Sequence, residues 1–247
     1  MQACRHCLPQ PPNGPLFVHP IDPPPASDRA HLDRWHAGDK ASGRELFRRH
    51  YDGISRFFRN KVKERDYEDL VQATFLGCLA NVSSFRGKSS FRTYLFGIAQ
   101  NKLSNYYRTL ASKHQGTIIN LGSCSAVDLG IGPSRMIARR QEERLLLAAL
   151  CRLPLQQQLV VELFYWEEMK AREIAEILEE PEPTIRRRLQ RAREQLRRQL
   201  ETSNAAPEIV ESTISNFDQW KYRLKRRLPR PSSSETRRES KARRTDE

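Results

Sequence analysis

The chain has 247 residues, with 43 lysines and arginines against 30 aspartates and glutamates, a net charge of +13 and a pI near 9.9. A positive field of this size attracts nucleic acid or an anionic membrane surface. The hydrophobic fraction of 38% favours one or two small domains with disordered ends over one large core. No stretch approaches the roughly 20 apolar residues that span a bilayer, and the start lacks the apolar run of a signal peptide. The sequence therefore predicts a cytoplasmic protein with reduced thiols.

The N-terminal segment is rich in proline. The run PQPPNGPLFVHPIDPPP carries too many prolines to pack, so residues 1–36 are predicted to form a disordered or polyproline arm. Cys4 and Cys7 flank His6 in a C-x-x-C spacing that suits a metal, but no second ligand pair lies nearby. We therefore expect neither a metal site nor a cofactor.

Apolar residues at helical spacing mark a first predicted domain, residues 37–110. Helices are expected around residues 46–58, 70–82 and 90–108. The apolar pattern of the second comprises Leu70, Val71, Phe75, Cys78, Leu79 and Val82. The buried face of the third comprises Phe91, Leu95, Ile98, Ala99 and Leu103.

Residues 111–136 interrupt this pattern, because four glycines are scattered there among serines and threonines, and they are predicted to form a flexible linker. Helical patterning resumes in a second domain, residues 137–201, where Pro154 opens a helix. The last two helical patterns are short and are separated by a turn that contains proline, which is the helix-turn-helix arrangement. No alternating strand pattern is present. The predicted fold class is all-α, in two helical lobes.

The last helical pattern, residues 184–200, has two unlike faces. At 100° per residue a stripe roughly 80° wide is predicted to be buried; it comprises Ile185, Leu189, Ala192, Leu196 and Leu200. The opposite face comprises Arg187, Gln190, Arg191, Glu194 and Arg198. Residues 184–200 contain seven arginines and one acid, whereas a solvated helix would interleave acids with bases. The pattern favours contact with phosphates and base edges.

The stretch EIAEILEEPEPTIRRRLQRAREQL, residues 173–196, resembles region four of the bacterial sigma factors, specifically the extracytoplasmic-function (ECF) group. The usual pattern of that group is E-I-A-E-x-L-G-x-P-x-G-T-V-x-x-R-L-x-R-A-R. Together with the exposed face, this resemblance predicts that the DNA-binding residues of the helix-turn-helix are Thr184, Arg186, Arg187, Gln190 and Arg191.

Two further motifs carry the resemblance into the first lobe. DYEDLVQATF, residues 66–75, is similar to the region-two segment with which sigma factors clamp the largest subunit of RNA polymerase. The resemblance implies polymerase contacts from Asp69, Leu70 and Gln72, of which Leu70 belongs to the apolar side of its helix. FRGKSSFRTYLFGIAQNKLSNYYR, residues 85–108, is similar to the segment that melts the promoter and reads its upstream element. The residues predicted for that role are Phe85, Arg86, Lys88, Arg92, Tyr94, Asn101, Lys102 and Asn105.

The composition of this segment agrees with the implied role, because capturing a base from a duplex requires stacking surfaces beside cations. Phe85, Arg86 and Lys88 precede a helix and are the candidates for holding a flipped base. Phe91 lies on the apolar face of that helix and is expected to belong to the core instead.

Three departures from the family pattern concern the turn and the last helix. Pro183 replaces a glycine, which is tolerated in a first helical turn because the missing N–H has no partner there. Glu179 and Glu180 replace a glycine and a hydrophobic residue, and Arg187 stands where serine is frequent. An additional arginine raises general DNA affinity, so the departures bear on sequence preference.

Residues 202–247 form a basic extension beyond the resemblance. Residues 207–224 keep helical spacing and are predicted to dock on the last domain, and the basic residues beyond them are predicted to bind DNA nonspecifically. A basic amphipathic helix on a membrane or a partner is the alternative.

The resemblance implies a sigma factor that binds core RNA polymerase and promoter DNA, with an anti-sigma factor as a possible further partner. No small-molecule substrate and no enzymatic activity are expected, because no nucleophile, metal cluster or nucleotide loop is evident. The alternative is a free-standing helix-turn-helix regulator, which would carry an effector domain in place of the clamp and melting motifs. A DNA recombinase would need a catalytic serine or tyrosine constellation that the sequence does not supply.

Overall fold

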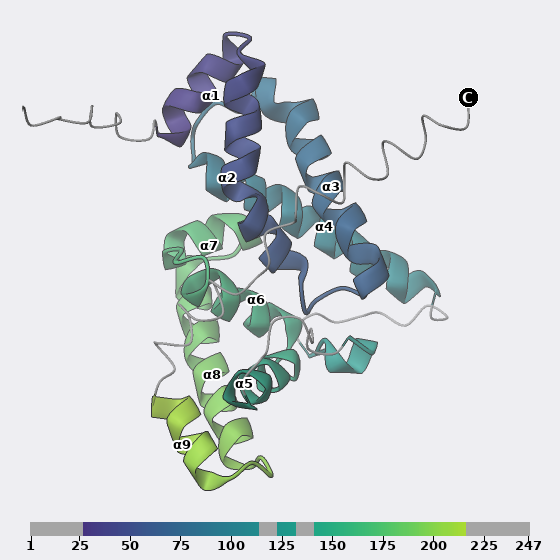
Figure 1. Ribbon diagram of the computed structural model, residues 1–247, viewed down its shortest axis with the longest axis vertical. Coiled ribbons are helices and arrows are strands. Elements are labelled where there is room, and N and C mark those ends of the chain that lie inside the picture. The colour runs from purple at the N-terminus through teal and green to yellow at the C-terminus, as the bar shows by residue number, and fades with distance from the viewer. Residues whose placement is uncertain (1–26, 114–122, 132–140, 216–247) are drawn as a thin grey trace, which may run out of the picture.

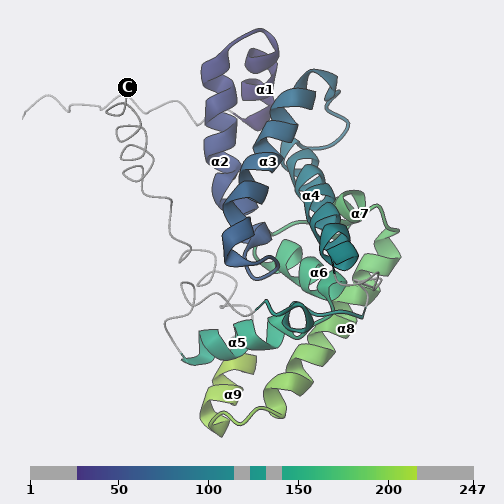
Figure 2. The ribbon, with the colours of Figure 1, turned by 90° about the vertical axis from the view of Figure 1, so that its right-hand side faces the viewer.

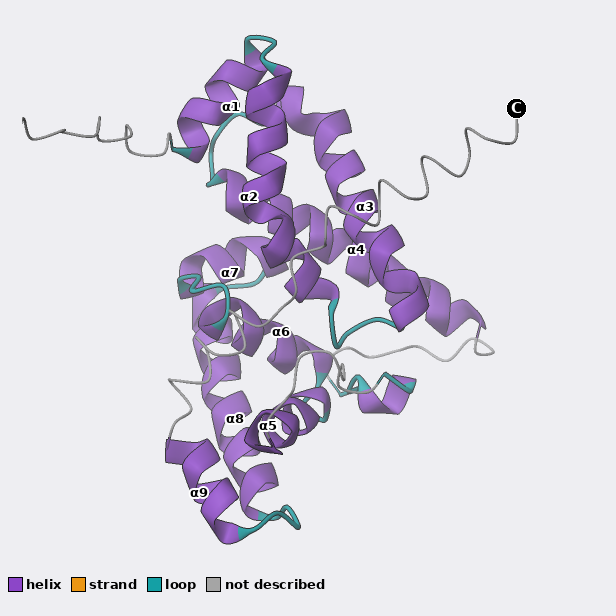
Figure 3. Cartoon of the chain, in the orientation of Figure 1, coloured by secondary structure: helices purple, strands orange, loops and turns teal. Residues whose placement is uncertain are grey.

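The computed structural model describes residues 27–113, 123–131 and 141–215 (Figure 1). Within these ranges every regular element is helical and no strand is present, which confirms the predicted all-α class (Figure 3). No helix in the described part of the chain is both long and apolar enough to cross a membrane. The helices form two lobes, α1–α4 and α5–α9, stacked one on the other.

The first lobe consists of α1 (Asp28–His36), α2 (Lys40–Phe58), α3 (Glu64–Asn81), a 3-10 turn η1 (Val82–Ser84) and α4 (Phe91–Lys113). Its core is aromatic and aliphatic. Phe57 and Phe96 meet edge to face with ring centroids 5.7 Å apart, and Ile54, Phe58 and Leu95 are fully buried beside them. Such edge-to-face pairs add to the stabilisation from apolar burial.

Helix α1 corrects the predicted extent of the N-terminal arm, since residues 28–36 are helical. Ser27 caps the helix by accepting a hydrogen bond from the N–H of Ala30 at 3.3 Å. Asp28 then binds His50 at 2.6 Å on α2, and Leu32 is buried. A helix with so little apolar surface gives almost no periodic signal in the sequence. The rest of the arm, residues 1–26, lies outside the described residues.

Two expectations about burial on α3 and α4 are resolved by the structure. Phe91 is 4% exposed, which confirms its assignment to the core. Leu79 was expected on the apolar side of its helix, but it is 53% exposed and its neighbour Leu76 is 56% exposed. The packed side of α3 is instead formed by Val71 and Cys78, both buried. Helix α3 packs against α2 and α4 with this side and leaves the opposite side exposed.

The second lobe consists of α5 (Gln141–Cys151), α6 (Leu155–Tyr165), α7 (Ala171–Leu178), α8 (Glu182–Glu201) and α9 (Pro207–Ser215). Helix α8 packs against α6, α7 and α5. Its buried residues are Ile185, Leu189, Ala192, Leu196 and Leu200, the predicted stripe. Helix α9 packs on α5 and α8, as expected of a docked helix, while residues 216–224 lie outside the described part.

Part of the predicted flexible linker is ordered against the second lobe. Residues 123–131 contain a 3-10 turn, η2 (Val127–Leu129), and Cys124 accepts a hydrogen bond from the N–H of Leu155 at 2.9 Å. Asp128 stabilises the turn by accepting hydrogen bonds from the backbone N–H and hydroxyl of Ser125 at 2.7 and 2.8 Å. Ala126 and Ile131 are buried. This segment therefore belongs structurally to the second lobe.

The lobes meet along α4 and α7, with α2 against α6 beside them, as two perpendicular views show (Figure 2). The contact places the first helix of the helix-turn-helix next to the helix that carries the predicted melting residues.

Candidate nucleic-acid interface

The turn between α7 and α8 sets the direction of α8. Glu179 ends α7 in the left-handed region, with φ of 54°, and the N–H of Glu180 bonds to the carbonyl of Ala175 at 3.0 Å. Helix α8 begins at Glu182, so Pro183 stands in its first turn. This confirms that proline is tolerated here, where its missing N–H has no helical partner.

The exposed face of α8 carries three arginines, Arg187, Arg191 and Arg198, and one acid, Glu194. Arg187, Gln190 and Arg191 are all exposed, opposite the buried stripe. Among the described residues, no acid lies within ion-pair distance of Arg187, Arg191 or Arg198. Their guanidinium groups are therefore available to phosphate oxygens or to the acceptor edge of guanine.

The remaining arginines of α8 lie on its flanks and have protein partners. Arg186, a predicted DNA-binding residue, bonds to Glu182 at 2.9 Å and is 71% exposed. Arg188 pairs with Glu180 at 2.7 Å. Arg193 donates to the hydroxyl of Tyr165 at 2.6 Å and so fastens α8 to α6. The flank arginines are therefore held by other residues of the protein, whereas Arg187, Arg191 and Arg198 are not paired with an acid among the described residues.

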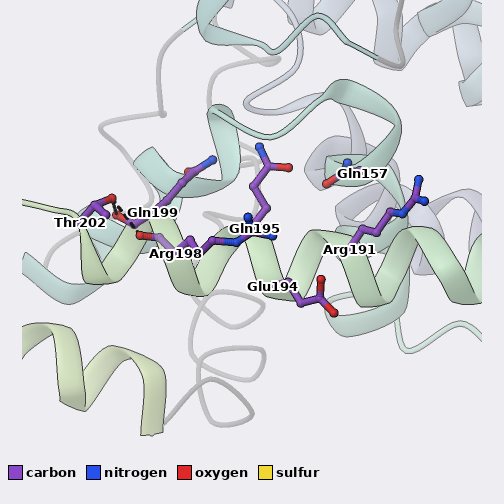
Figure 4. A pocket seen from close by; sticks show the side chains of 7 residues that line it. All are labelled: Gln157, Arg191, Glu194, Gln195, Arg198, Gln199 and Thr202. Atoms are coloured by element: carbon purple, nitrogen blue, oxygen red, sulfur yellow. Dashed lines mark hydrogen bonds between the residues drawn. The ribbon is translucent and has the colours of Figure 1, made fainter.

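A shallow groove of about 540 Å³ runs beside the C-terminal half of α8 (Figure 4). Gln157, at the start of α6, faces it from the other side. The α8 side chains that line it include Arg191, Glu194 and Arg198. Arg191 and Arg198 thus border a groove that is open to solvent, where their guanidinium groups can reach phosphate oxygens.

The predicted base-holding loop lies between η1 and α4. Phe85 is half-buried and stacks on Tyr94 with ring centroids 4.5 Å apart, while Arg86 and Lys88 are exposed. Gly87 adopts φ of 68°, a backbone conformation that favours glycine because it has no Cβ. The loop presents two cations beside an aromatic pair.

The other predicted melting residues separate into two groups. Asn101 and Asn105 are exposed on α4, and Lys102 is half-buried. Arg92 points elsewhere, because its guanidinium binds the carboxylate of Glu167 at 2.7 Å across the contact between the lobes. Arg92 therefore does not lie with the loop cations in this conformation.

The exposed side of α3 forms a second candidate surface, a protein-binding one. Asp69 and Gln72 are exposed as predicted, while Leu70 is half-buried against the core. Leu76 and Leu79 continue the same side of the helix and were missed by the sequence interpretation. Leu76 and Leu79 follow Gln72 by four and seven residues, a helical spacing that puts all three on one side of the helix, and this spacing could have identified them from the sequence. Leu76 and Leu79, three residues apart, form a small exposed apolar patch on this side of α3.

The described residues contain no group of three or more metal-ligating side chains, and the Cys4-x-x-Cys7 segment lies outside them. Burial raises the pKa of the Cys78 thiol to about 12, and burial likewise raises that of Cys151 to about 12. Both thiols are core groups and not ligands or nucleophiles.

Comparison with known proteins identifies the family. Residues 46–113 match the family model "Sigma-70 region 2" and residues 143–196 match "Sigma-70, region 4". The chain is 32% identical over 166 residues to "RNA polymerase sigma factor YlaC" of Bacillus subtilis, covering 67% of this chain and 95% of that protein. The chain belongs to the sigma-70 family of RNA polymerase sigma factors. Proteins of this family direct RNA polymerase to promoters.

Other relatives place this sigma factor in the ECF group. It is 27% identical over 181 residues to "ECF RNA polymerase sigma-E factor" of Haemophilus influenzae, covering 71% of this chain and 96% of the relative. Against the protein of that name from Escherichia coli it is 25% identical over 174 residues, with coverages of 68% and 91%. The region-2 match ends with α4 and the region-4 match spans α5 to most of α8, so α1 and α9 lie outside both.

Two solved structures share the fold. "CnrH in complex with the cytosolic domain of CnrY" aligns with a TM-score of 0.53 at 24% identity, covering 72% of this chain and 99% of that one. "The sigma factor RpoE in complex with the anti-sigma factor NepR" from Bartonella quintana aligns with a TM-score of 0.53 at 23% identity, with coverages of 65% and 98%.

Proposed function

We propose that this sigma factor reads one promoter element with the exposed face of α8 and melts and reads a second with the loop and α4 of the first lobe. The observation that carries the proposal is the unpaired arginine face, Arg187, Arg191 and Arg198, on the second helix of a helix-turn-helix. A helix in that position enters the major groove, where arginine binds guanine or phosphate through two parallel hydrogen bonds.

Exposed cations beside an aromatic pair in the first lobe support a role in strand separation. In this proposal Arg86 and Lys88 hold phosphates of the displaced strand, and Phe85 stacks on an extruded base. Because Phe85 already stacks on Tyr94, an incoming base would extend an existing stack of rings. Asn101 and Asn105 offer hydrogen bonds to base edges from the exposed side of α4.

Core RNA polymerase is proposed to bind the exposed side of α3, formed by Asp69, Gln72, Leu76 and Leu79. The leucines would lose water-exposed apolar area on binding, and the polar pair would fix the register. The polymerase then supplies all bond-forming chemistry, and the sigma factor supplies recognition.

Transcription in vitro with purified core polymerase tests this function. Promoters would first be selected from a random DNA library by the holoenzyme. We expect open complexes and defined transcripts only when core polymerase and this protein are both present. Equal promoter-specific affinity with and without core polymerase would support a free-standing regulator instead.

An anti-sigma partner stays a prediction. The RpoE structure contains such a partner, but its likeness to this chain concerns the fold. Affinity purification of the tagged chain from its own host, followed by inhibition of transcription with any captured protein, would test it.

A further inference from the structure

Helix α1 contacts the base-holding loop, residues 85–90, from the side. Just before the loop, Nε2 of His36 lies 3.0 Å from the carbonyl oxygen of Val82, which can only accept a hydrogen bond, so the imidazole donates it. In the middle of the loop, the guanidinium group of Arg29 lies against Gly87, with its Nη1, Cζ and Nη2 atoms within 4 Å of the position that a Cβ on Gly87 would take. The helix and the loop therefore share one surface, although they are far apart in the sequence.

The backbone of α1 is fixed on the rest of the first lobe. At its start, Asp28 binds His50 of α2 at 2.6 Å. At its end, Trp35 meets Phe47 of α2 edge to face, with ring centroids 5.3 Å apart. Arg29 directly follows the first of these anchors, so its backbone keeps its place beside the loop and only its side chain has freedom to turn.

Arg29 adds a third positive charge to the loop. Gly87, which it contacts, stands between Arg86 and Lys88 in the sequence, and both of these side chains are exposed. The side chain of Arg29 is 66% exposed, and its ion pair at 3.2 Å is with Asp33, whose side chain is 58% exposed. A pair between two exposed groups contributes little. The guanidinium group can therefore leave Asp33 for another anion at little cost.

The surroundings of these three cations indicate which anion they suit. Like charges repel one another until an anion binds between or beside them. The loop also carries the stacked rings of Phe85 and Tyr94. Cations beside stacking rings are the combination with which proteins hold a single strand of nucleic acid, the cations on its phosphates and the rings on its bases.

Arg29 is assigned no role by the sequence or by the family match. It falls within residues 1–36, which were predicted to form the N-terminal arm, and before the region-2 match at residues 46–113. We infer that Arg29 is a further DNA-binding residue of the melting site and binds a backbone phosphate of the displaced strand, beside the nucleotide whose base stacks on Phe85. This inference rests on the proposed function and adds α1 to its DNA-binding surface.

The test measures how tightly the holoenzyme binds single-stranded DNA from a selected promoter, covering the segment that is unpaired in the open complex. Each phosphate contact to a single strand contributes about 0.7 to the slope of log affinity against log salt concentration. The contribution of one contact vanishes near 1 M salt and grows about fivefold for each tenfold dilution. We therefore expect Arg29→Gln to lower the slope by about 0.7 and to bind about fivefold more weakly at about 0.1 M salt.

Arg48→Gln is the matched control, because Arg48 is also an exposed arginine of the first lobe with an acidic neighbour on its own helix. Its side chain is 74% exposed and pairs with Glu45 at 2.7 Å. This variant loses the same charge and is expected to keep the affinity and the salt slope of the wild type. An equal loss in both variants would reflect net charge alone and would overturn the inference.

A second substitution separates a phosphate contact from a structural support of the loop. Arg29→Lys keeps the positive charge but lacks the planar group that lies against Gly87. A phosphate contact predicts that Arg29→Lys keeps the wild-type slope. Weaker binding by Arg29→Gln with an unchanged slope would mean that Arg29 only supports the loop, which overturns the contact. Both variants should melt at the wild-type temperature, because the replaced side chain is exposed.

Failure of this inference and failure of the proposed function give different results. The double variant Phe85→Ala, Lys88→Ala is measured on the same single strand. If it binds weakly while Arg29→Gln matches the wild type in affinity and slope, the loop holds DNA without α1, and only the inference is overturned. If both match the wild type, the loop does not contact the strand, and its proposed function fails as well.

Discussion

Replacing Arg187 or Arg191 by alanine tests whether α8 contacts promoter DNA or is only a charged, solvent-exposed helix. Both side chains are exposed, and neither has an acid within ion-pair distance among the described residues. Alanine is a good helix former, so the free energy of unfolding is expected to change by only about 0.5 kcal/mol or less. Any larger effect on promoter binding must then come from lost DNA contacts.

The size of the loss depends on what each arginine contacts. A contact to a base edge contributes about 1–3 kcal/mol, which is roughly a 5- to 160-fold loss of affinity, and its removal relaxes preference at one base pair. A phosphate contact weakens binding to all sequences alike and lowers the salt slope by about one. We expect the first behaviour for Arg191, which matches the family pattern, and the second for Arg187, which departs from it.

Fluorescence titrations of the holoenzyme with selected promoter DNA, repeated at several salt concentrations, measure both quantities. Arg197→Ala is the matched control, because Arg197 is 67% exposed on the same helix but lies on its flank and pairs with Glu201 at 3.2 Å. Full promoter affinity and an unchanged salt slope in both test variants would refute DNA reading by α8. The role would then move to the basic cluster at residues 221–230, outside the described part of the chain.

Three further predictions concern the first lobe and the buried thiols. The double variant Phe85→Ala, Lys88→Ala is expected to form fewer open complexes on duplex promoters while keeping its affinity for core polymerase, and to recover on a pre-melted bubble; unchanged activity on duplex DNA would exclude base capture by this loop. The double variant Leu76→Gln, Leu79→Gln should weaken core polymerase binding about tenfold or more with little change in melting temperature. The control Val127→Gln, at a position 46% exposed on the second lobe, should have no effect. Equal affinity of the wild type, the double variant and the control would exclude the α3 surface. Burial raises the pKa of Cys78 and Cys151 to about 12, so both thiols stay protonated at pH 8 and form thiolate only near pH 12. Peptide mapping after iodoacetamide treatment should find both cysteines unmodified in the folded chain and modified in denaturant. Modification of the folded chain would contradict their burial.

The sequence predicts α8 in detail because one physical signal decides its orientation. Its apolar residues recur at helical spacing over many turns, and burial of that stripe leaves the arginines on the other side. The packing of Phe91 followed from the same periodicity. These features are local, so one segment contains all the information they need.

Other features depend on contacts that no local pattern encodes. Leu79 was placed with the buried side of α3 because it is apolar, but burial depends on which neighbour the helix meets, and that side of α3 has none in the described structure. Helix α1 gave too little apolar signal to be separated from the arm. Glu167 and Arg56 stand 111 residues apart, and each resembles an ordinary surface charge in the sequence. Only the arrangement of the lobes makes them a buried pair.

The left-handed conformation of Glu179 restricts which residues the turn before α8 can accept. A side chain with a Cβ disfavours that conformation by about 1–2 kcal/mol, so the surrounding packing, including buried Ile174 and Ile177 of α7, holds the residue there. Position 179 therefore accepts residues that tolerate a positive φ and disfavours those that do not. Glycine or asparagine would relax the turn, whereas valine or isoleucine would strain its backbone, and the melting temperatures of variants at this position would reveal that ordering.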